Sequence, residues 1–541
     1  MKDYEIADKA LMDDIESVGS KIGLTDDNIV SYGNIIGKIS YNDINNHDNY
    51  GKLILVTAVN PTPYGEGKTT VSIGLGDALS KLGMNVSLSL REPSMGPVFG
   101  IKGGACGGGY SQIVPMDKIN LNFTGDFAAI SAANNLLCAA IDNHISKGNS
   151  LGFDRVIFRR CLDVNDRSLR NVSTSLYDTS FDITAASEVM ALFCLANSLD
   201  DLKFRLGNII CGFDKNNNPI LASDLKIEGA LTAILKDAFM PNLVQTLENT
   251  PTIVHGGPFA NIAHGCSSIV ATKTSLTLSD YTITEAGFGS DLGAEKFFDI
   301  VCQSNNIKPD AVVLVVTVKA LKYNAGVSSD NIYENNPDKV KEGLPNLEVH
   351  IENILKCNSN LIVAINKYDT DTDEEINVIT NYLDSKNIPY AVSTAYKDGG
   401  DGATTLASVL LDTLKSDNTF TPIYDYSDDI FTKIEKVAKN IYRSSDVVYS
   451  DTALKKISEI NDSSYKNFPI CISKTQYSIS DNPKALNAPI NNTLHVTDVK
   501  VYGGAGFITV YTGNIITMPG LPSHPNYEKI DVVNDKIVGL S

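Results

Sequence analysis

Residues 56–70 read Val56-Thr57-Ala58-Val59-Asn60-Pro61-Thr62-Pro63-Tyr64-Gly65-Glu66-Gly67-Lys68-Thr69-Thr70 and decide the fold. The apolar, β-branched run over 53–59 predicts a buried parallel strand. Apolar residues at helical spacing after Lys68 predict a helix that ends near Gly83. A strand, a glycine-containing loop and a helix opened by Gly-Lys-Thr form a cradle whose backbone N–H groups face a phosphate. The stretch therefore predicts nucleotide binding.

The residues of this loop suit a phosphate in different ways. Lys68 supplies positive charge, and the Thr69 hydroxyl is a ligand for Mg²⁺. Gly65 and Gly67 let the backbone turn and approach the anion closely. Thr62 stands where the strict motif has glycine, and the alternative is an ordinary strand-to-helix turn with a surface lysine. The candidate nucleotide-binding residues are Thr62, Pro63, Tyr64, Gly65, Glu66, Gly67, Lys68, Thr69 and Thr70.

The composition predicts a globular protein with a large buried core. The chain has 541 residues, 43% of them hydrophobic and 20% charged, with a net charge of −19. So acidic a chain is a poor partner for nucleic acid or an anionic membrane. No apolar run is long enough to span a bilayer, and the nine cysteines include no Cys-x-x-Cys pair. We expect a cytoplasmic protein without a nucleic-acid or membrane partner.

Strands that alternate with helices predict an α/β fold with a doubly wound parallel sheet of the P-loop type. Residues 1–50 have the spacing of a helical lead-in. The pattern of predicted strands, helices and loops changes near residue 355 and again near 450. We therefore expect a large nucleotide-binding domain over 1–355, an α/β domain over 356–447 and a C-terminal α/β domain over 448–541. Further apolar strands are expected over 85–90, 311–317 and 361–365.

Glycine-rich loops follow several of the predicted strands. The longest, 91–110, mixes glycines and prolines with Arg91, Glu92, Lys102 and Tyr110. A flexible linker is the alternative, but linkers are polar throughout. Because α/β folds place their sites at the carboxyl ends of strands, we expect this loop to be functional.

These motifs resemble those of the monofunctional formate–tetrahydrofolate ligases (formyltetrahydrofolate synthetases). The similar segments run in the family's order from near the start of the chain to its end. The family also has threonine at the position of Thr62. They are 61–70, Leu90-Arg91-Glu92-Pro93-Ser94, 96–104, Phe123-Thr124-Gly125-Asp126, Phe181-Asp182-Ile183-Thr184, 255–265, 285–291, Lys474-Thr475-Gln476-Tyr477-Ser478 and Met518-Pro519-Gly520-Leu521-Pro522.

The resemblance implies a cytoplasmic homotetramer that uses ATP to join formate to N10 of tetrahydrofolate. It also implies formyl phosphate as the intermediate, Mg²⁺ with ATP, and a monovalent cation such as K⁺ or NH₄⁺. Formate is a poor electrophile until one oxygen carries a phosphoryl group. Two anions must also be brought together, so positioning and positive charge should supply most of the catalysis.

In this hypothesis Lys68 and Thr69 bind the ATP phosphates and Mg²⁺. Arg91 offers a planar fork for formate and formyl phosphate; the alternative is a structural ion pair with Glu92 or another carboxylate. The resemblance places the monovalent cation at Glu92. Lys102 either adds positive charge near the transferred group or is a solvated loop lysine.

Asp126, His255 and His264 lie in matching loops and are candidates for moving protons from N10, although a lone histidine is as often a structural hydrogen-bonder. By resemblance, Tyr368 and Tyr396 stack on the folate ring; the alternative is that they are ordinary surface tyrosines.

Four positions depart from the family. Asn122, Ala128 and Asn324 stand where we expect histidine, and Tyr396 stands where the family has tryptophan. An inactive paralogue that still binds nucleotide is thus one alternative. A GTP-binding switch protein is another, because Asn366-Lys367-Tyr368-Asp369 follows an apolar strand as in guanine-binding loops. That segment, however, lies too far along the chain from Lys68 for a single small G domain.

Overall fold

The computed structural model describes residues 1–42, 44, 50–100, 104–513 and 515–540. Its centre is a 12-stranded sheet in the order β1-β2-β14-β15-β4-β16-β3-β17-β18-β19, with β5 and β6 attached beside β14. The strands are β1 (Ile29–Ser31), β2 (Gly37–Ile39), β3 (Lys52–Ala58), β4 (Val86–Leu90), β5 (Gly107–Gly108), β6 (Ser111–Val114), β14 (Asn242–Thr246), β15 (Pro251–Val254), β16 (Tyr281–Glu285), β17 (Ala311–Val316), β18 (Leu361–Asn366) and β19 (Tyr390–Ser393).

All neighbouring strands from β15 to β19 are parallel. Their carboxyl ends therefore lie along one edge of the sheet, which we call the carboxyl edge. The prediction of an α/β fold with a large parallel sheet is confirmed. The antiparallel strands β1, β2, β6 and β14 at its other end were not expected, and the helical lead-in proves to be two short helices, α1 (Asp3–Ala7) and α2 (Ile15–Ser20), followed by β1 and β2.

The central strands are apolar because both faces of the sheet are covered. Leu53 and Leu55 of β3 belong to one hydrophobic core, and Ile54 and Val56 to another, as expected when successive side chains point to opposite faces. The first core includes residues of α10 (Ile269–Leu278), α13 (Pro337–Cys357) and α14 (Asp373–Ser385); the second includes α3 (Lys68–Lys81) and α16 (Thr404–Thr413).

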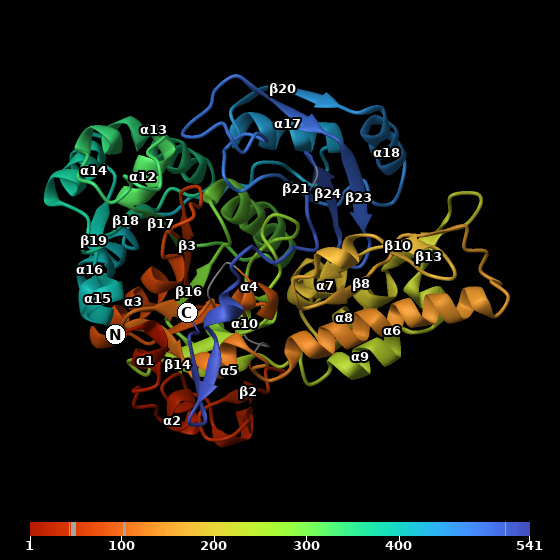
Figure 1. Cartoon of the computed structure of the whole chain (residues 1–541), viewed down its shortest axis with the longest axis horizontal. Helices are drawn as coiled ribbons and strands as arrows, with labels where there is room; N and C mark the ends of the chain where they lie inside the picture. Colours follow the sequence, from red (N-terminus) through yellow and green to blue (C-terminus); the bar gives the residue numbers. More distant parts are fainter. Residues whose placement is uncertain (43, 45–49, 101–103, 514, 541) are drawn as a thin grey trace.

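Most of the segment between β6 and β14 forms a separate lobe, orange to yellow in Figure 1. Its helices pack with three small sheets. The elements of this lobe are α6 (Asp126–Ser146), β7 (Arg155–Val156), β8 (Arg160–Leu162), β9 (Val172–Ser173), β10 (Asp178–Thr179), β11 (Phe181–Ile183), α7 (Glu188–Leu195), α8 (Leu199–Gly207), β12 (Ile210–Phe213), β13 (Pro219–Leu221) and α9 (Glu228–Leu235). The short helix α5 (Met116–Asn120) precedes the lobe and packs in the second core of the main sheet.

The C-terminal part, blue in Figure 1, has a hydrophobic core of its own that includes Ile434, Ile457 and Val510. Parallel β20–β22 and the sheet β21-β24-β23 form its strands. Its elements are α17 (Ile430–Asn440), β20 (Ser444–Tyr449), α18 (Asp451–Asn461), β21 (Ile470–Ser473), β22 (Asn492–Val496), β23 (Asp498–Tyr502) and β24 (Phe507–Tyr511). The last hairpin, β25 (Asp531–Val533) and β26 (Lys536–Val538), returns to the main sheet, where Ile530, Ile537 and Leu540 join the second core.

The sheet runs across the domain boundary expected near residue 355. β18 pairs with β17, and β19 pairs with β18, so residues 361–393 continue the sheet of the first expected domain. The three-domain division stays a prediction, and the main sheet gives no support to a break at 355.

Candidate functional site

The loop between β3 and α3 has the glycine geometry expected from its sequence. Gly65 and Gly67 both have a φ of 73°, and Gly67 directly precedes Lys68, the first residue of α3. A Cβ on Gly67 would lie 2.3 Å from Asn366 Nδ2. Asn366 ends β18 and donates a hydrogen bond to the Glu66 carbonyl at 3.0 Å. Backbone conformation and close packing therefore both require glycine at position 67.

Thr62 and Glu66 brace the loop from within. The Thr62 N–H donates to Glu66 Oε1 at 2.7 Å, and the Tyr64 N–H donates to the Thr62 hydroxyl at 3.3 Å. Thr62 thus holds the loop through a hydroxyl that glycine lacks.

Lys68 and Thr69 open α3 beside the end of β16. The Thr69 hydroxyl donates to Glu285 Oε2 at 3.1 Å. Burial lowers the pKa of Lys68, Glu66 and Glu285 act in the opposite direction, and Arg91 adds to the lowering. Burial raises the pKa of Glu285, and Arg91 and Lys68 oppose that rise. A hydroxyl beside a carboxylate at a helix N-terminus is a donor set that fits Mg²⁺.

Arg91 follows β4, two strands from β3. Its Nη1 donates to the Pro258 carbonyl at 3.3 Å, and a Cβ on Gly287 would lie 2.9 Å from the same Nη1. In the parts of the chain that the structure describes, Arg91 forms no ion pair with Glu92 or any other carboxylate. The guanidinium group of Arg91 is partly buried and retains N–H donors that can bind an anion.

Glu92 points into the protein near Asp126. Glu92 Oε2 is buried without a hydrogen-bond partner among the described residues. Burial raises the pKa of Glu92 well above its ordinary value, Asp126 acts in the same direction, and Lys38 opposes them. An unsatisfied, buried carboxylate oxygen fits a cation ligand.

Asp126 is already engaged at both oxygens. Lys38 Nζ lies 2.8 Å from Oδ1, with both side chains 1% exposed, and Asn242 Nδ2 donates to Oδ2 at 2.7 Å. Asp126 therefore has no free oxygen to take a proton from a substrate in this conformation.

The two predicted histidines differ. Both ring nitrogens of His255 are occupied: Nδ1 lies 2.6 Å from the Ser268 hydroxyl and Nε2 lies 2.8 Å from the Ala238 carbonyl. Burial lowers its pKa to about 4. These contacts favour the structural alternative for His255. His264 is buried, its pKa falls to about 3 through burial and the nearby Arg91, and neither ring nitrogen has a partner among the described residues.

The other half of the carboxyl edge is aromatic. The rings of Tyr368 and Tyr396 lie 6.5 Å apart between centroids at 40°, beyond the ends of β18 and β19. Lys319, in α12 (Val318–Asn324), places its Nζ 3.8 Å from the Tyr368 centroid and 5.1 Å from that of Tyr333. Tyr64 of the 59–67 loop packs edge-on against Tyr333 at 6.2 Å. An aromatic group with one buried lysine thus adjoins the loop.

Comparison with known proteins decides the family. A family model for formate–tetrahydrofolate ligase matches residues 1–541. The chain belongs to the formate–tetrahydrofolate ligase family. It is therefore an ATP-dependent ligase of formate and tetrahydrofolate, two substrates of one-carbon metabolism. A solved structure, the G51S mutant of L. casei FPGS, shares 10% sequence identity with this ligase over 85% of this chain and 91% of its own, at a TM-score of 0.21. So distant a likeness carries no argument.

The three positions where we expected histidine from the resemblance lie in different surroundings. Asn122 and Ala128 are exposed. Asn324 is buried, donates to the Ala320 carbonyl at 2.9 Å and accepts from the Asn487 N–H at 2.9 Å. It is thus a structural contact between α12 and the C-terminal part. Lys102 lies outside the described residues.

Three residues of the candidate site were given no site role from the sequence: Glu285 and Asn366, which lay in quoted motifs, and Lys319. Glu285 and Asn366 each end a buried strand with a polar group, a signal that the strand pattern contains. The sequence around Lys319 contains no such signal, because its aromatic neighbours, Tyr333 and Tyr368, lie elsewhere in the chain.

Other features of the ligase lie away from this edge. A cavity of about 880 Å³ separates the middle lobe from β23 and includes Arg155, Arg170 and Lys500 in its wall; none of the predicted site residues lines it. In the described ranges, no group of three or more histidine, cysteine, aspartate or glutamate side chains is arranged to hold a metal ion, and no helix has the length and apolarity needed to cross a membrane.

Proposed function

We propose that this ligase makes 10-formyltetrahydrofolate, ADP and phosphate through formyl phosphate, with ATP on residues 62–70 and formate beside Arg91. The supporting observation is the order of strands. β4, β16 and β3 are parallel neighbours, so Arg91, Glu285 and the 59–67 loop converge at the ends of adjacent strands. Two cationic side chains, Lys68 and Arg91, thereby share one edge with an acidic group suited to Mg²⁺.

The first step transfers a phosphoryl group. A formate oxygen attacks the γ-phosphorus of ATP, the bond to the β,γ-bridging oxygen breaks, and ADP leaves. Lys68 and the N–H groups at the start of α3 hold the phosphates, and Arg91 holds formate in line against the repulsion of two anions. In the second step N10 of tetrahydrofolate attacks the formyl carbon, phosphate leaves, and N10 loses a proton.

Two cations fit residues at this edge. Thr69, with Glu285 beside it, would hold Mg²⁺, and the unpartnered Oε2 of Glu92 would hold a monovalent cation such as K⁺ or NH₄⁺. When bound, they neutralise phosphate charge and stabilise the charge that develops during transfer.

Tetrahydrofolate is proposed to bind on the aromatic half of the edge. A flat ring stacked between two others needs a separation of roughly 7 Å and near-parallel planes. The centroids of Tyr368 and Tyr396 lie 6.5 Å apart with their planes inclined at 40°, so stacking requires one tyrosine ring to turn. Tyr368 OH is 3.5 Å from the position of a Cβ on Gly67, so a folate stacked there would lie next to the phosphates.

The three proposed proton-handling residues have unequal support. His264 has unpartnered ring nitrogens and lies close enough to Arg91 to feel its charge, which makes it the best placed of the three. His255 and Asp126 are held by their neighbours, and in our proposal they act by keeping the loops that carry Arg91 and Glu92 in place: the Glu92 N–H donates to the Gly256 carbonyl at 2.7 Å.

The resemblance to the family supports a proposal on assembly and location. We propose a homotetramer in the cytoplasm that uses small-molecule substrates only. All nine cysteines are free and buried, which suits a reducing compartment. Light scattering of the purified chain tests the tetramer.

The decisive assay follows formation of 10-formyltetrahydrofolate with and without formate, on wild type and Arg91→Ala. We expect formate-dependent product and a loss of at least about 100-fold in Arg91→Ala. Arg155→Ala is the matched control, since Arg155 lies in the remote cavity wall and stacks on Phe213 at 4.6 Å. Full activity in Arg91→Ala would overturn its assignment.

Two alternatives have distinct outcomes in the same assay. Asn122, Ala128 and Asn324, in place of the family's histidines, favour an inactive paralogue, which would bind ATP but release no ADP in the presence of formate and tetrahydrofolate. A guanine-binding switch, the alternative drawn from Asn366-Lys367-Tyr368-Asp369, would prefer GTP and ignore formate.

A further inference from the structure

Asn60, the last residue before Pro61, is bonded through its N–H and its side-chain amide to parts of the chain far away in sequence. Its N–H donates to His350 Nε2 at 3.0 Å, and its Oδ1 accepts from Asn346 Nδ2 at 2.9 Å. Its Nδ2 donates to Asp291 Oδ1 at 3.3 Å and approaches the Gln476 carbonyl at 3.4 Å. The exit of the 59–67 loop from β3 is therefore fixed from three sides.

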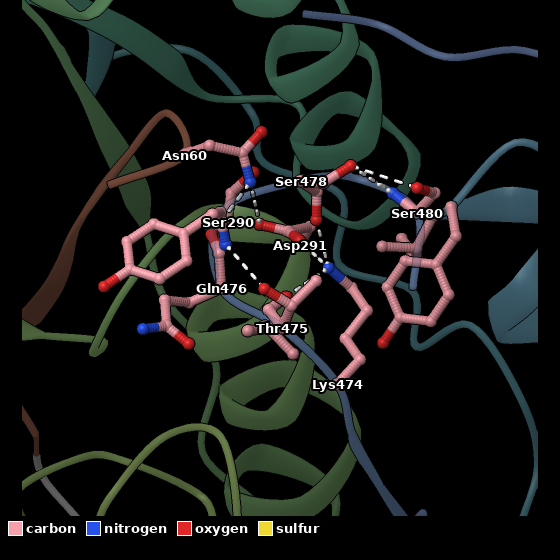
Figure 2. A network of polar contacts seen from close by, with 12 residues as sticks. Asn60, Ser290, Asp291, Lys474, Thr475, Gln476, Ser478 and Ser480 are labelled. Carbon is pink, nitrogen blue, oxygen red and sulfur yellow. Dashed lines mark hydrogen bonds and ion pairs between the residues drawn. The ribbon is translucent and has the colours of Figure 1, made fainter. Parts of the chain in front are cut away.

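Lys474 and Asp291 form the centre of this network (Figure 2). Lys474 Nζ lies 2.7 Å from Asp291 Oδ2, and both side chains are 0% exposed. The same ammonium donates to the carbonyls of Thr475 and Ser478. One buried cation thus binds its own segment, 474–478 of the C-terminal part, to the helical turn after Gly289 on the carboxyl edge.

Stability alone is a poor explanation for such a pair. Removing two charges from water costs several kcal/mol each, and buried ion pairs replaced by apolar residues are often as stable. What a buried pair with directional bonds supplies is one defined arrangement. Here that arrangement is the position of Asp291 Oδ1 and the Gln476 carbonyl, which together receive Asn60 Nδ2.

We propose that the Lys474–Asp291 pair is a positioning element of the ATP site, which holds residues 474–478 against Asn60 and thereby sets where the 59–67 loop leaves β3. This rests on the proposed binding of ATP at residues 62–70. Lys474 and Asp291 act through Asn60 and do not touch the substrate.

His350 completes the network in its neutral form. His350 Nε2 lies 3.0 Å from the Asn60 backbone nitrogen and 3.1 Å from Asn60 Oδ1, and Nδ1 lies 2.7 Å from the Ser290 hydroxyl. Nε2 accepts the Asn60 N–H in the neutral tautomer that carries its proton on Nδ1. Burial lowers the pKa of His350 to about 4, Asp291 opposes this, and Lys474 and Arg443 add to it. The contacts of Asn60 are therefore intact at neutral pH.

The test compares two buried lysines of the C-terminal part. Lys474→Met removes the pair; Lys433→Met is the matched control, because Lys433 is also 0% exposed and its Nζ donates to the carbonyls of Lys466 and Phe468, away from Asn60. We expect the Kd for MgATP to rise about tenfold in Lys474→Met and less than about twofold in Lys433→Met, with similar losses of thermal stability. Equal Kd values in the two variants overturn the proposal.

Asp291→Asn serves if Lys474→Met does not fold, because it keeps a hydrogen-bonding side chain toward Lys474 and Asn60 while removing the charge. A rise in Kd for MgATP above that of Lys433→Met is again expected, and an unchanged Kd overturns the proposal.

A double-mutant cycle tests the route through Asn60. If the pair acts through Asn60, Lys474→Met should weaken MgATP binding by less than about twofold once Asn60→Ala is present. Additive effects overturn the proposal. Lys68→Ala separates this outcome from failure of the ATP site: unchanged MgATP binding in Lys68→Ala removes the basis of the proposal altogether, whereas a strong loss there with additive Asn60 and Lys474 effects overturns the positioning role alone.

Discussion

The hydroxyl of Thr69 and Oε2 of Glu285 lie 3.1 Å apart, joining the first turn of α3 to the end of β16. The contact is a consequence of topology, because β16 is the parallel neighbour of β3 and pairs Glu285 with Val56. It places a carboxylate, which is 6% exposed, at the point where the phosphates and Mg²⁺ of ATP are proposed to bind.

Glu285→Gln should raise the Mg²⁺ concentration needed for half-maximal ADP release by about tenfold, because a carboxylate beside a metal ligand orients it and adds charge. Glu188→Gln is the control: Glu188 is equally buried at 6% and bonds the Gly504 N–H. A Mg²⁺ titration of both variants checks this, and identical curves would remove Glu285 from the metal site.

Gly67→Ala should lower the affinity for ATP by more than the backbone strain of an alanine at positive φ explains. Gly67 and Gly83 both have positive φ, 73° and 79°, but a Cβ meets Asn366 Nδ2 at 2.3 Å only at Gly67, and nothing within 4 Å at Gly83. Each substitution costs on the order of 1 kcal/mol in backbone conformation, so the excess loss in Gly67→Ala measures the contact with Asn366. The comparison variant is Gly83→Ala. If Gly67→Ala and Gly83→Ala bind ATP equally well, the close approach of Gly67 to Asn366 is contradicted.

Tyr396→Ala should raise the KM for tetrahydrofolate about tenfold and leave the KM for ATP unchanged, since a stacked ring contributes on the order of 1 kcal/mol beyond its buried area. Tyr396→Phe retains the ring and loses only the hydrogen bond to Asp3, so it should keep the wild-type KM. Steady-state kinetics with each substrate varied in turn measure both KM values. If the KM for tetrahydrofolate is the same in Tyr396→Ala and Tyr396→Phe, Tyr396 is an ordinary surface tyrosine.

His350 gives a pH prediction with a defined sign. Its pKa is about 4 in the folded protein and 6.5 in the unfolded chain. Between these values the unfolded chain binds more protons, so stability is lost as the pH falls from about 6.5 toward 4. By pH 5 this loss is on the order of 2 kcal/mol.

His350→Gln lacks this titration, so its deficit against wild type should shrink between pH 7 and pH 5. Buried carboxyls with raised pKa, such as Glu188 at about 7, act in the opposite direction in both proteins and cancel in the difference. Unfolding midpoints at the two pH values provide the measurement, and a deficit that stays constant would show that His350 is not held neutral.

Local pattern explains which parts of the site were predictable. The strand over 53–59, the glycines at 65 and 67 and the start of the helix at Lys68 depend on neighbouring residues, and the structure has them as expected. Arg91 was predictable because a loop that follows a parallel strand reaches the carboxyl edge.

Contacts between distant residues were not predictable in this way. Lys38 pairs with Asp126 across 88 residues, and Asn60 meets Gln476 across 416. No periodicity encodes such pairs, because they follow from the order of strands. The domain boundary expected near residue 355 depends on the same kind of information. β18 is a buried apolar strand like β17, and the local sequence pattern does not tell which sheet a strand joins.

The most direct test of the proposed chemistry uses formate labelled with ¹⁸O, together with ATP and tetrahydrofolate, and mass analysis of the phosphate released. The formate oxygen that attacks the γ-phosphorus stays on that phosphate when N10 displaces it from the formyl carbon. We predict one ¹⁸O atom from formate in each phosphate; phosphate free of label would contradict a formyl phosphate intermediate.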